Sequence, residues 1–158
     1  MSAVVQFPPF NVRTMMADDL DEVMRIELAE YPYPWTRKIF ADCLRVGYHC
    51  FVGEVDGLFA GYGVMSTGVG EAHILNVCVS RDFQRRGLGH ILLETMLTMA
   101  AELKVETVFL EVRPSNEGAQ KLYQQFGFNE IAIRKNYYPT GKGREDALIL
   151  ALELSPGN

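Results

Sequence analysis

The middle of the chain holds a strand-like segment, a glycine-rich turn and a helix-forming run in direct succession. Residues 71–80, EAHILNVCVS, are mostly apolar and predict a central strand of a sheet. Residues 83–96, FQRRGLGHILLETM, then place two arginines and two glycines immediately before a run of helix formers. Because glycine is costly to order, its presence at a helix start indicates a special demand on the backbone there. A fold for this chain must therefore carry a buried strand that turns tightly into a helix.

The turn at residues 84–89, QRRGLG, has the composition of an anion site. The first N–H groups of a helix have no partner within the helix, and the helix dipole makes that end electropositive. Gly87 and Gly89 let the backbone approach a ligand closely, and Arg85 and Arg86 add positive charge. The pattern predicts a cradle that fits a pyrophosphate, although it matches neither the P-loop nor the dinucleotide fingerprint. A tight turn with solvated arginines explains the same six residues, so the motif alone leaves both interpretations open.

Strands and helices alternate along the rest of the chain without an obvious linker. Asp56-Gly57 predicts a hairpin between two strands, and Leu20, Val23, Met24 and Leu28 lie near helical spacing. The expected strands are 10–15, 49–55, 58–66, 71–80, 105–112, 128–137 and 146–154, and the expected helices are 18–30, 36–46, one after the QRRGLG turn, and 115–127. This order predicts one mixed α/β domain over residues 1–158, with a single, mostly antiparallel sheet of about seven strands flanked by about four helices.

Composition excludes several classes of function. The net charge of −5 argues against broad nucleic-acid binding, because a phosphate backbone attracts basic surfaces. The sequence has no apolar run of about 18 residues, so we expect no membrane span, and its start, MSAVVQFPPF, does not resemble a secretory signal. Three cysteines without a CxxC pair fit reduced thiols in a cytoplasm. The three histidines show no metal-ligand spacing, so we expect no metal site.

The turn is similar to the Q/R-x-x-G-x-G/A signature of the GCN5-related N-acetyltransferases, and the order of strands and helices resembles that fold. Three further blocks, YPW at 33–35, LEVRPSNEGAQKLYQQFGF at 110–128 and RKNYYPTGKGREDALILAL at 134–152, resemble the bacterial ribosomal-protein-alanine N-acetyltransferases within that superfamily. The likeness covers nearly the whole chain. It implies the acetyltransferase fold, acetyl-CoA as co-substrate and a protein N-terminus as acceptor.

The resemblance also implies roles for individual residues. Backbone groups of the strand should bind the pantetheine arm, the turn should hold the pyrophosphate, and Asn116 should contact the cofactor near its reactive end. Glu111 matches the family's proton acceptor, and Tyr123 matches its proton donor. His90 stands where relatives often carry Arg or Lys, which would weaken one phosphate contact. The implied cofactor-binding residues are Val77, Cys78, Val79, Arg85, Arg86, Gly87, Leu88, Gly89, His90 and Asn116.

The chemistry of the two implied catalytic residues follows from their surroundings in the sequence. Glu111 lies in TVFLEV, where its apolar neighbours should exclude water from the carboxyl group and so raise its pKa. A higher pKa would make Glu111 a better base, acting directly or through a water. Alternatively, it pairs with Arg113 and solvates a strand end. Tyr123 lies on an apolar helical stripe, where an aromatic is usually core, yet its hydroxyl would stabilise a departing thiolate.

Other residues leave alternatives open. Two clusters of aromatic residues either form the wall of a peptide groove or pack two loops together. These residues are Tyr31, Tyr33 and Trp35 near the first helix, and Tyr137 and Tyr138 near the end of the chain. Cys78 stands in an apolar strand without a basic neighbour, which favours a buried structural thiol over an acyl-carrying nucleophile. The segment GKGRED is a solvated turn, or its acids Glu145 and Asp146 meet a basic substrate residue.

These observations predict a cytoplasmic enzyme that acetylates the N-terminal α-amine of a protein by direct transfer in a ternary complex. The resemblance points to the N-terminal alanine of the small-subunit ribosomal protein eighteen. A protein α-amine, with a pKa near 8, is easier to deprotonate than lysine by about 3 kcal/mol. The alternatives are an acetyltransferase for lysine or small amines, and a non-catalytic acyl-CoA sensor. The sequence leaves the oligomeric state open, and a monomer fits it.

Overall fold

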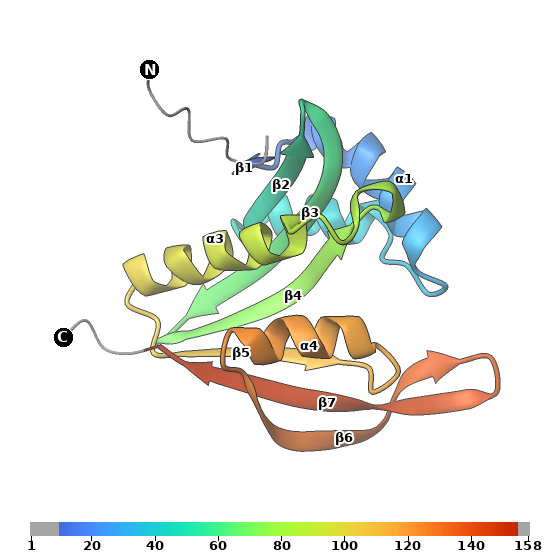
Figure 1. The fold of residues 1–158 in the computed structure, drawn as a ribbon, viewed down its shortest axis with the longest axis vertical. Helices are drawn as coiled ribbons and strands as arrows, with labels where there is room; N and C mark the ends of the chain where they lie inside the picture. Colours follow the sequence, from blue (N-terminus) through green and yellow to red (C-terminus); the bar gives the residue numbers. More distant parts are fainter. Residues whose placement is uncertain (1–9, 155–158) are drawn as a thin grey trace. The chain divides into compact units, whose positions relative to one another are not determined.

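The computed structural model describes residues 10–154, which form a seven-stranded mixed sheet in the order β1-β2-β3-β4-β5-β7-β6 (Figure 1). β4 and β5 are parallel, whereas β1–β2, β5–β7 and β6–β7 are antiparallel. The strands are β1 (Phe10–Thr14), β2 (His49–Val55), β3 (Leu58–Gly68), β4 (Glu71–Val79), β5 (Thr107–Val112), β6 (Asn129–Thr140) and β7 (Gly143–Glu153). The α-helices are α1 (Leu20–Glu30), α2 (Arg37–Arg45), α3 (Leu88–Glu102) and α4 (Glu117–Gln125), and short 3-10 turns are η1 (Ala17–Asp19) and η2 (Arg81–Phe83).

The fold class and the order of elements predicted from the sequence are confirmed. Asp56 and Gly57 both have positive φ, 52° and 79°, as a two-residue hairpin requires. Thr36 caps α2 by accepting a hydrogen bond from the backbone N–H of Ile39 at 3.3 Å. Local turn and cap chemistry thus fixes the ends of these elements.

Contacts group the described residues into two compact units. Unit 1 comprises the described residues of Met1–Val64 together with Asn76–Thr95, and unit 2 comprises Met65–Leu75 and the described residues of Met96–Asn158. The single domain expected for residues 1–158 stays a prediction.

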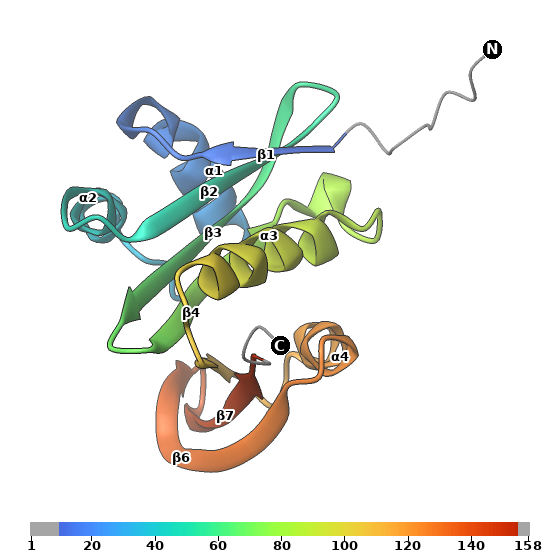
Figure 2. The ribbon, with the colours of Figure 1, turned by 90° about the vertical axis from the view of Figure 1, so that its left-hand side faces the viewer.

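Unit 1 is a sheet covered by helices on both faces (Figure 2). On β3, a Cβ placed at Gly61 would lie 3.4 Å from Leu92 of α3, so this residue faces α3. Its neighbour Tyr62 packs edge-on against Phe40 of α2 and reaches Glu27 of α1, so it faces the opposite side. The buried Leu88, Leu92 and Leu93 of α3 and Val23 and Ile26 of α1 complete this core.

Unit 2 is built around β5, β7, β6 and α4. The side chains of β5 alternate strictly between its two faces. Val108, Leu110 and Val112 are buried on one face, whereas Glu111 lies on the other. β6 is the edge strand, and its ladder with β7 is interrupted by register shifts between Glu130 and Ala132 and between Arg134 and Tyr138. These bulges bend β6 (Figure 1).

Two details of the sequence-based prediction are wrong. Leu28 was expected on the apolar face of the first helix, but it is 62% exposed, whereas Glu27 is 2% exposed. β6 extends to Thr140, and β7 begins at Gly143. Most of the loop expected between residues 137 and 146 therefore belongs to the two strands of the hairpin. The expectation for the first nine residues lies outside the described residues. In the described part of the chain, no helix is long and apolar enough to cross a membrane.

Candidate active site

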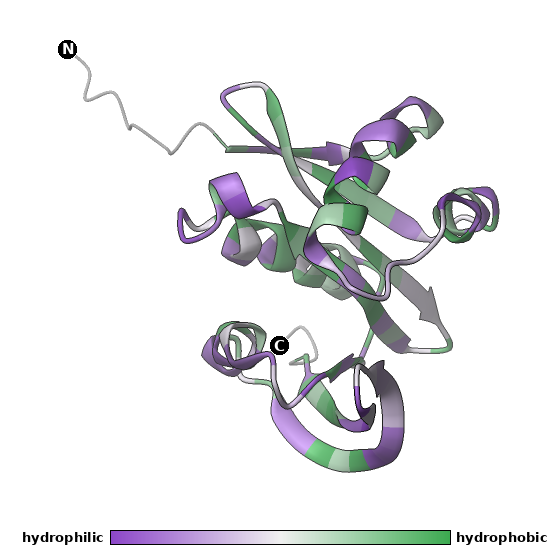
Figure 3. Cartoon of the chain, turned by 90° about the vertical axis from the view of Figure 1, so that its right-hand side faces the viewer, coloured by the Kyte–Doolittle hydropathy of each residue, from purple (hydrophilic) through white to green (hydrophobic). Residues whose placement is uncertain are grey.

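The turn before α3 in unit 1 has the geometry expected of an anion cradle. Gly87 has φ +94°, and Arg85 has φ +65°, a left-handed conformation that is strained for a residue with a side chain. A Cβ on Gly87 would meet nothing closer than Phe10 Cε2 at 3.8 Å, so glycine is required by the backbone angle rather than by space. Arg85, Arg86 and His90 are exposed beside it. Figure 3 shows η2 and this turn as a hydrophilic segment leading into α3.

α3 begins at Leu88, and its 15 residues give it a full helix dipole. The N–H groups of its first turn point out of the helix end, since a helix offers them no internal acceptor. Leu88 itself is buried and anchors this end against β2, where a Cβ on Gly53 would lie 3.0 Å from its side chain. Gly89 lies inside the first turn and is not among the residues with positive φ. The helix end is therefore fixed by packing, while its amides face the exposed turn.

The second half of β4 lies beyond the ladder with β5. Its parallel ladder with β5 covers Glu71–Ile74 and ends there. Beyond that point, the carbonyl of Val77 accepts the Tyr31 hydroxyl at 3.3 Å, and the carbonyl of Val79 accepts Gln84 Nε2 at 2.9 Å. An open strand edge of this kind can pair with an extended ligand as if it were a further strand.

Gly61 fixes the position of this edge. A Cβ on Gly61 would come within 2.6 Å of the carbonyl oxygen of Cys78, which would force the backbone of β4 to move. Cys78 is itself buried, and desolvation raises the pKa of its thiol to about 11. A buried, protonated thiol is a poor nucleophile, which favours the structural interpretation of Cys78.

Glu27 is a buried carboxylate that the sequence did not single out. Its Oε1 accepts hydrogen bonds from the Tyr62 hydroxyl at 2.6 Å and from Asn76 Nδ2 at 3.2 Å, and its Oε2 accepts the Trp35 backbone N–H at 2.8 Å. The carboxylate therefore ties the segment after α1 to β3 and β4. Trp35 also stacks on Phe40, with ring centroids 5.1 Å apart. Within unit 1, Trp35 has a packing role, which its sequence could not distinguish from a groove wall.

In unit 2, Glu111 is paired with a histidine. Its Oε2 lies 2.6 Å from Nε2 of His73 on the neighbouring strand β4. The expectation that apolar neighbours would raise the pKa of this carboxyl group is wrong. The hydrogen bond from His73 lowers the pKa of Glu111 and outweighs desolvation, with the charges of His73 and Arg134 acting in the same direction. Glu111 is thus held as a carboxylate.

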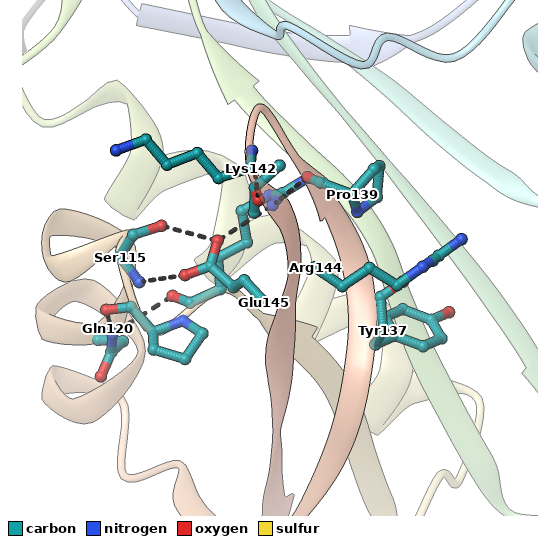
Figure 4. Close-up of polar contacts among 10 residues, drawn as sticks. Ser115, Gln120, Tyr137, Pro139, Lys142, Arg144 and Glu145 are labelled. Atoms are coloured by element: carbon teal, nitrogen blue, oxygen red, sulfur yellow. Dashed lines mark hydrogen bonds and ion pairs between the residues drawn. The ribbon is translucent and has the colours of Figure 1, made fainter.

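The alternative partner for Glu111, Arg113, is engaged elsewhere. Its Nη1 donates to Glu145 Oε1 and to the Pro139 carbonyl, each at 3.0 Å, and its guanidinium lies 4.4 Å from the Tyr138 ring centroid. Glu145 also accepts hydrogen bonds from the backbone N–H and the hydroxyl of Ser115 (Figure 4). This clamp fixes the tip of the β6–β7 hairpin to the segment between β5 and α4.

Tyr123 on α4 is 8% exposed and packs edge-on against Phe128. Burial raises the pKa of its phenol to about 12, and its hydroxyl has no hydrogen bond to another described residue. The pKa of Tyr138 on β6 is raised by burial, and the negative charge of Glu111 acts in the same direction. Asn116 caps α4, because its Oδ1 accepts the Ala119 N–H at 3.1 Å.

The remaining candidates have structural partners. Asp146 pairs with Lys135 and accepts the Asn136 backbone N–H, and Tyr137 packs against Tyr138 with ring centroids 4.9 Å apart. Among the described residues, no group of three or more His, Cys, Asp or Glu side chains could hold a metal ion.

Comparison with known proteins agrees with this geometry. The sequence profile of the acetyltransferase (GNAT) family matches residues 20–128. The bS18-alanine N-acetyltransferase of Escherichia coli K12 is 40% identical over 145 residues, covering 92% of this chain and 98% of the relative. A putative bS18-alanine N-acetyltransferase of Bacillus subtilis 168 is 38% identical over 141 residues, covering 88% and 92%.

Solved structures give the same result. The crystal structure of the ribosomal-protein-S18-alanine N-acetyltransferase from Escherichia coli superimposes with a TM-score of 0.88 at 38% identity, covering 94% of this chain and 96% of the other. Ard1 from Thermoplasma volcanium superimposes with a TM-score of 0.83 at 27% identity, covering 92% and 98%. With its sequence matched by the family profile over more than half its length and its fold matched over nearly all of it, the chain belongs to the acetyltransferase (GNAT) family.

Proposed function

We propose that this protein transfers the acetyl group of acetyl-CoA to the N-terminal α-amine of a protein, and that its substrate is the N-terminal alanine of ribosomal protein bS18. The observation that carries this proposal is the likeness to the Escherichia coli bS18-alanine N-acetyltransferase over 98% of that enzyme's length. A ribosomal protein as substrate would also place this protein in the cytoplasm. The geometry of the described residues supports each part of the reaction.

Unit 1 has the features needed to bind the coenzyme. The pyrophosphate fits the exposed turn of Arg85, Arg86 and Gly87, where the backbone already has the positive φ that exposes its amides. The N–H groups of Leu88, Gly89 and His90 at the start of α3 add the dipole of a long helix. The pantetheine arm fits the unpaired part of β4, from Val77 to Val79. Acetyl-CoA supplies the acetyl group as a thioester.

Glu111 is the base in this proposal. Its carboxylate accepts a proton from the substrate ammonium, directly or through a water, and the freed lone pair attacks the thioester carbonyl carbon. With an ordinary carboxyl pKa of 4.5, proton transfer from an α-amine is uphill by about 5 kcal/mol and from lysine by about 8 kcal/mol. Because His73 lowers the pKa of Glu111 further, the base is a weak one. The difference of about 3 kcal/mol between the two amines favours the more acidic α-ammonium over lysine whatever the pKa of the base.

Tyr123 assists the departing CoA thiolate. Full proton donation from a phenol with a pKa of about 12 to a thiolate with a pKa near 8.5 is uphill by about 5 kcal/mol. A hydrogen bond from the hydroxyl to the developing negative charge avoids that cost, and proton transfer completes only after the C–S bond has broken. We assign Tyr123 this stabilising role, in addition to its packing against Phe128.

The protein substrate is expected to contact the clamp in unit 2. Ser115 and Glu145 are hydrogen-bonded at the hairpin tip (Figure 4). Arg113 donates to Glu145 and lies over the Tyr138 ring, so the hairpin presents Tyr138 in one orientation. Since the carboxylate of Glu145 is already engaged twice by Ser115 and once by Arg113, we assign it to positioning rather than to binding a basic substrate residue. A rigid aromatic gives a peptide large contact area at low entropy cost.

A competition between two peptides tests this function. One begins with the N-terminal alanine sequence of bS18, and the other has a blocked N-terminus and an internal lysine. We expect free CoA thiol to be released with the first peptide and not with the second. Preference for the lysine peptide would support a lysine acetyltransferase instead. Coenzyme binding without thiol release on either peptide would support an acyl-CoA sensor.

A further inference from the structure

The contact between His73 and Glu111 is built by the sheet. In the parallel ladder, His73 of β4 is the register partner of Phe109, and Glu111 lies two residues further along β5 on the same face. This placement brings Nε2 of the imidazole to 2.6 Å from Oε2 of the carboxylate. The two side chains are 38% and 18% exposed, so the pair is partly shielded from water. A hydrogen bond this short to a partly buried carboxylate is a strong one.

The chemistry of the pair fixes the position of one proton. An ionised carboxylate only accepts hydrogen bonds, so the shared hydrogen is on Nε2. The imidazole therefore donates from Nε2 to Glu111, and this hydrogen bond favours the ionised form of the carboxyl group.

The groups facing this pair come from several elements. Arg134 of β6 lowers the pKa of Glu111 through its charge, and Tyr138 of β6 and Tyr123 of α4 are neutral phenols in the same region. Arg113, directly after β5, is bound by Glu145. Of these groups, His73 is the one whose side chain is hydrogen-bonded to Glu111.

We propose that His73 is a positioning residue for Glu111, fixing Oε2 through its Nε2–H so that Oε1 faces the substrate amine. This inference rests on the proposed function, because it assumes that Glu111 is the base. The amine proton goes to Oε1 and from there to water, so His73 takes part in no covalent step. His73 contacts neither the coenzyme nor the amine.

The test is the pH profile of kcat/KM for the alanine peptide in three variants. His73→Phe removes the donor, and we expect kcat at neutral pH to fall about tenfold and the acidic limb to move up by about one pH unit. KM for acetyl-CoA should stay within twofold of wild type. His73→Gln keeps an N–H donor, so it should restore most of kcat. His49→Phe on β2, outside the proposed machinery, is the matched control and should keep the wild-type profile.

A double-variant cycle separates this role from a structural one. If His73 acts through Glu111, His73→Phe has no further effect on the rate in the Glu111→Gln background. Fold losses that multiply in the double variant, or a wild-type pH profile in His73→Phe, would overturn the proposal for His73 while leaving Glu111 as the base. A wild-type rate in Glu111→Gln alone would overturn the assignment of the base and this inference with it. If His73→Phe does not fold, His73→Gln carries the test, since an N–H donor at this position should retain most of kcat, and a loss as large as that of Glu111→Gln would overturn the proposal.

Discussion

Replacement of Gly87 by alanine tests the coenzyme cradle most specifically. Gly87 has φ +94°, and the space around it is open, with Phe10 Cε2 as the nearest atom at 3.8 Å from an added Cβ. The only cost of a methyl group is therefore the backbone angle, about 1–2 kcal/mol for a residue with a side chain. Because the turn is exposed, we expect it to relax in the free protein, and the strain returns when the pyrophosphate demands the original conformation. The dissociation constant for CoA should then rise by a factor of about 5–30.

Isothermal titration with CoA measures this effect, and Gly47→Ala is the matched control. Gly47 follows α2 with φ +84°, and an added Cβ would meet nothing within 4 Å. The same strain at that position should lower the melting temperature by about 2–8 °C and leave CoA binding unchanged. If Gly87→Ala bound CoA as tightly as wild type, or if Gly47→Ala weakened binding equally, the cradle would have to be placed elsewhere.

Further predictions concern catalysis and stability. Glu111→Gln should lower kcat at neutral pH and recover as the pH approaches the pKa of the amine; an equal loss at every pH in the rate profile would contradict a role as base. Tyr123→Phe should lower kcat about 10²-fold without changing the melting temperature, and a normal kcat would leave the residue a core role only. Arg13 holds the pKa of Asp19 below 3.8, so the stability of this pair is present above that pH and lost as the pH falls; Asp19→Asn should flatten the acid limb of thermal unfolding, and an unchanged limb would contradict it. Gly118→Ala on α4 should raise the free energy of unfolding by up to about 1 kcal/mol in chemical denaturation, because alanine favours a helix and an added Cβ would meet no atom within 4 Å. A lower free energy of unfolding would contradict this reasoning.

The order of elements could be predicted because their signals are local. Asp56 and Gly57 adopt the positive φ that their residue types accept. Thr36 caps a helix by accepting a hydrogen bond from the backbone N–H of Ile39, three residues further along. Gly87 likewise has a positive φ, a conformation that glycine adopts at no steric cost in such a turn. Each of these features depends on residues that are close in sequence.

The parts that could not be predicted depend on residues far apart. His73 and Glu111 are 38 residues apart, and only the parallel register of β4 and β5 brings them together. The apolar neighbours of Glu111 in the sequence predicted a raised pKa for its carboxyl group. In the structure, the hydrogen bond from His73 lowers that pKa instead. The sequence did not single out Glu27, which is held in the core by a hydrogen bond from Tyr62, 35 residues away. A polar partner supplied by tertiary structure leaves no periodic signal in the sequence.

The most direct test of the central claim is the position of the transferred acetyl group on bS18. The protein is incubated with bS18 and acetyl-CoA, and the product is fragmented in a mass spectrometer. We expect a mass gain of one acetyl group, located on the N-terminal alanine, and no gain when that amine is blocked beforehand. An acetyl group on a lysine side chain, or an unmodified bS18 after CoA binding has been verified, would contradict the account.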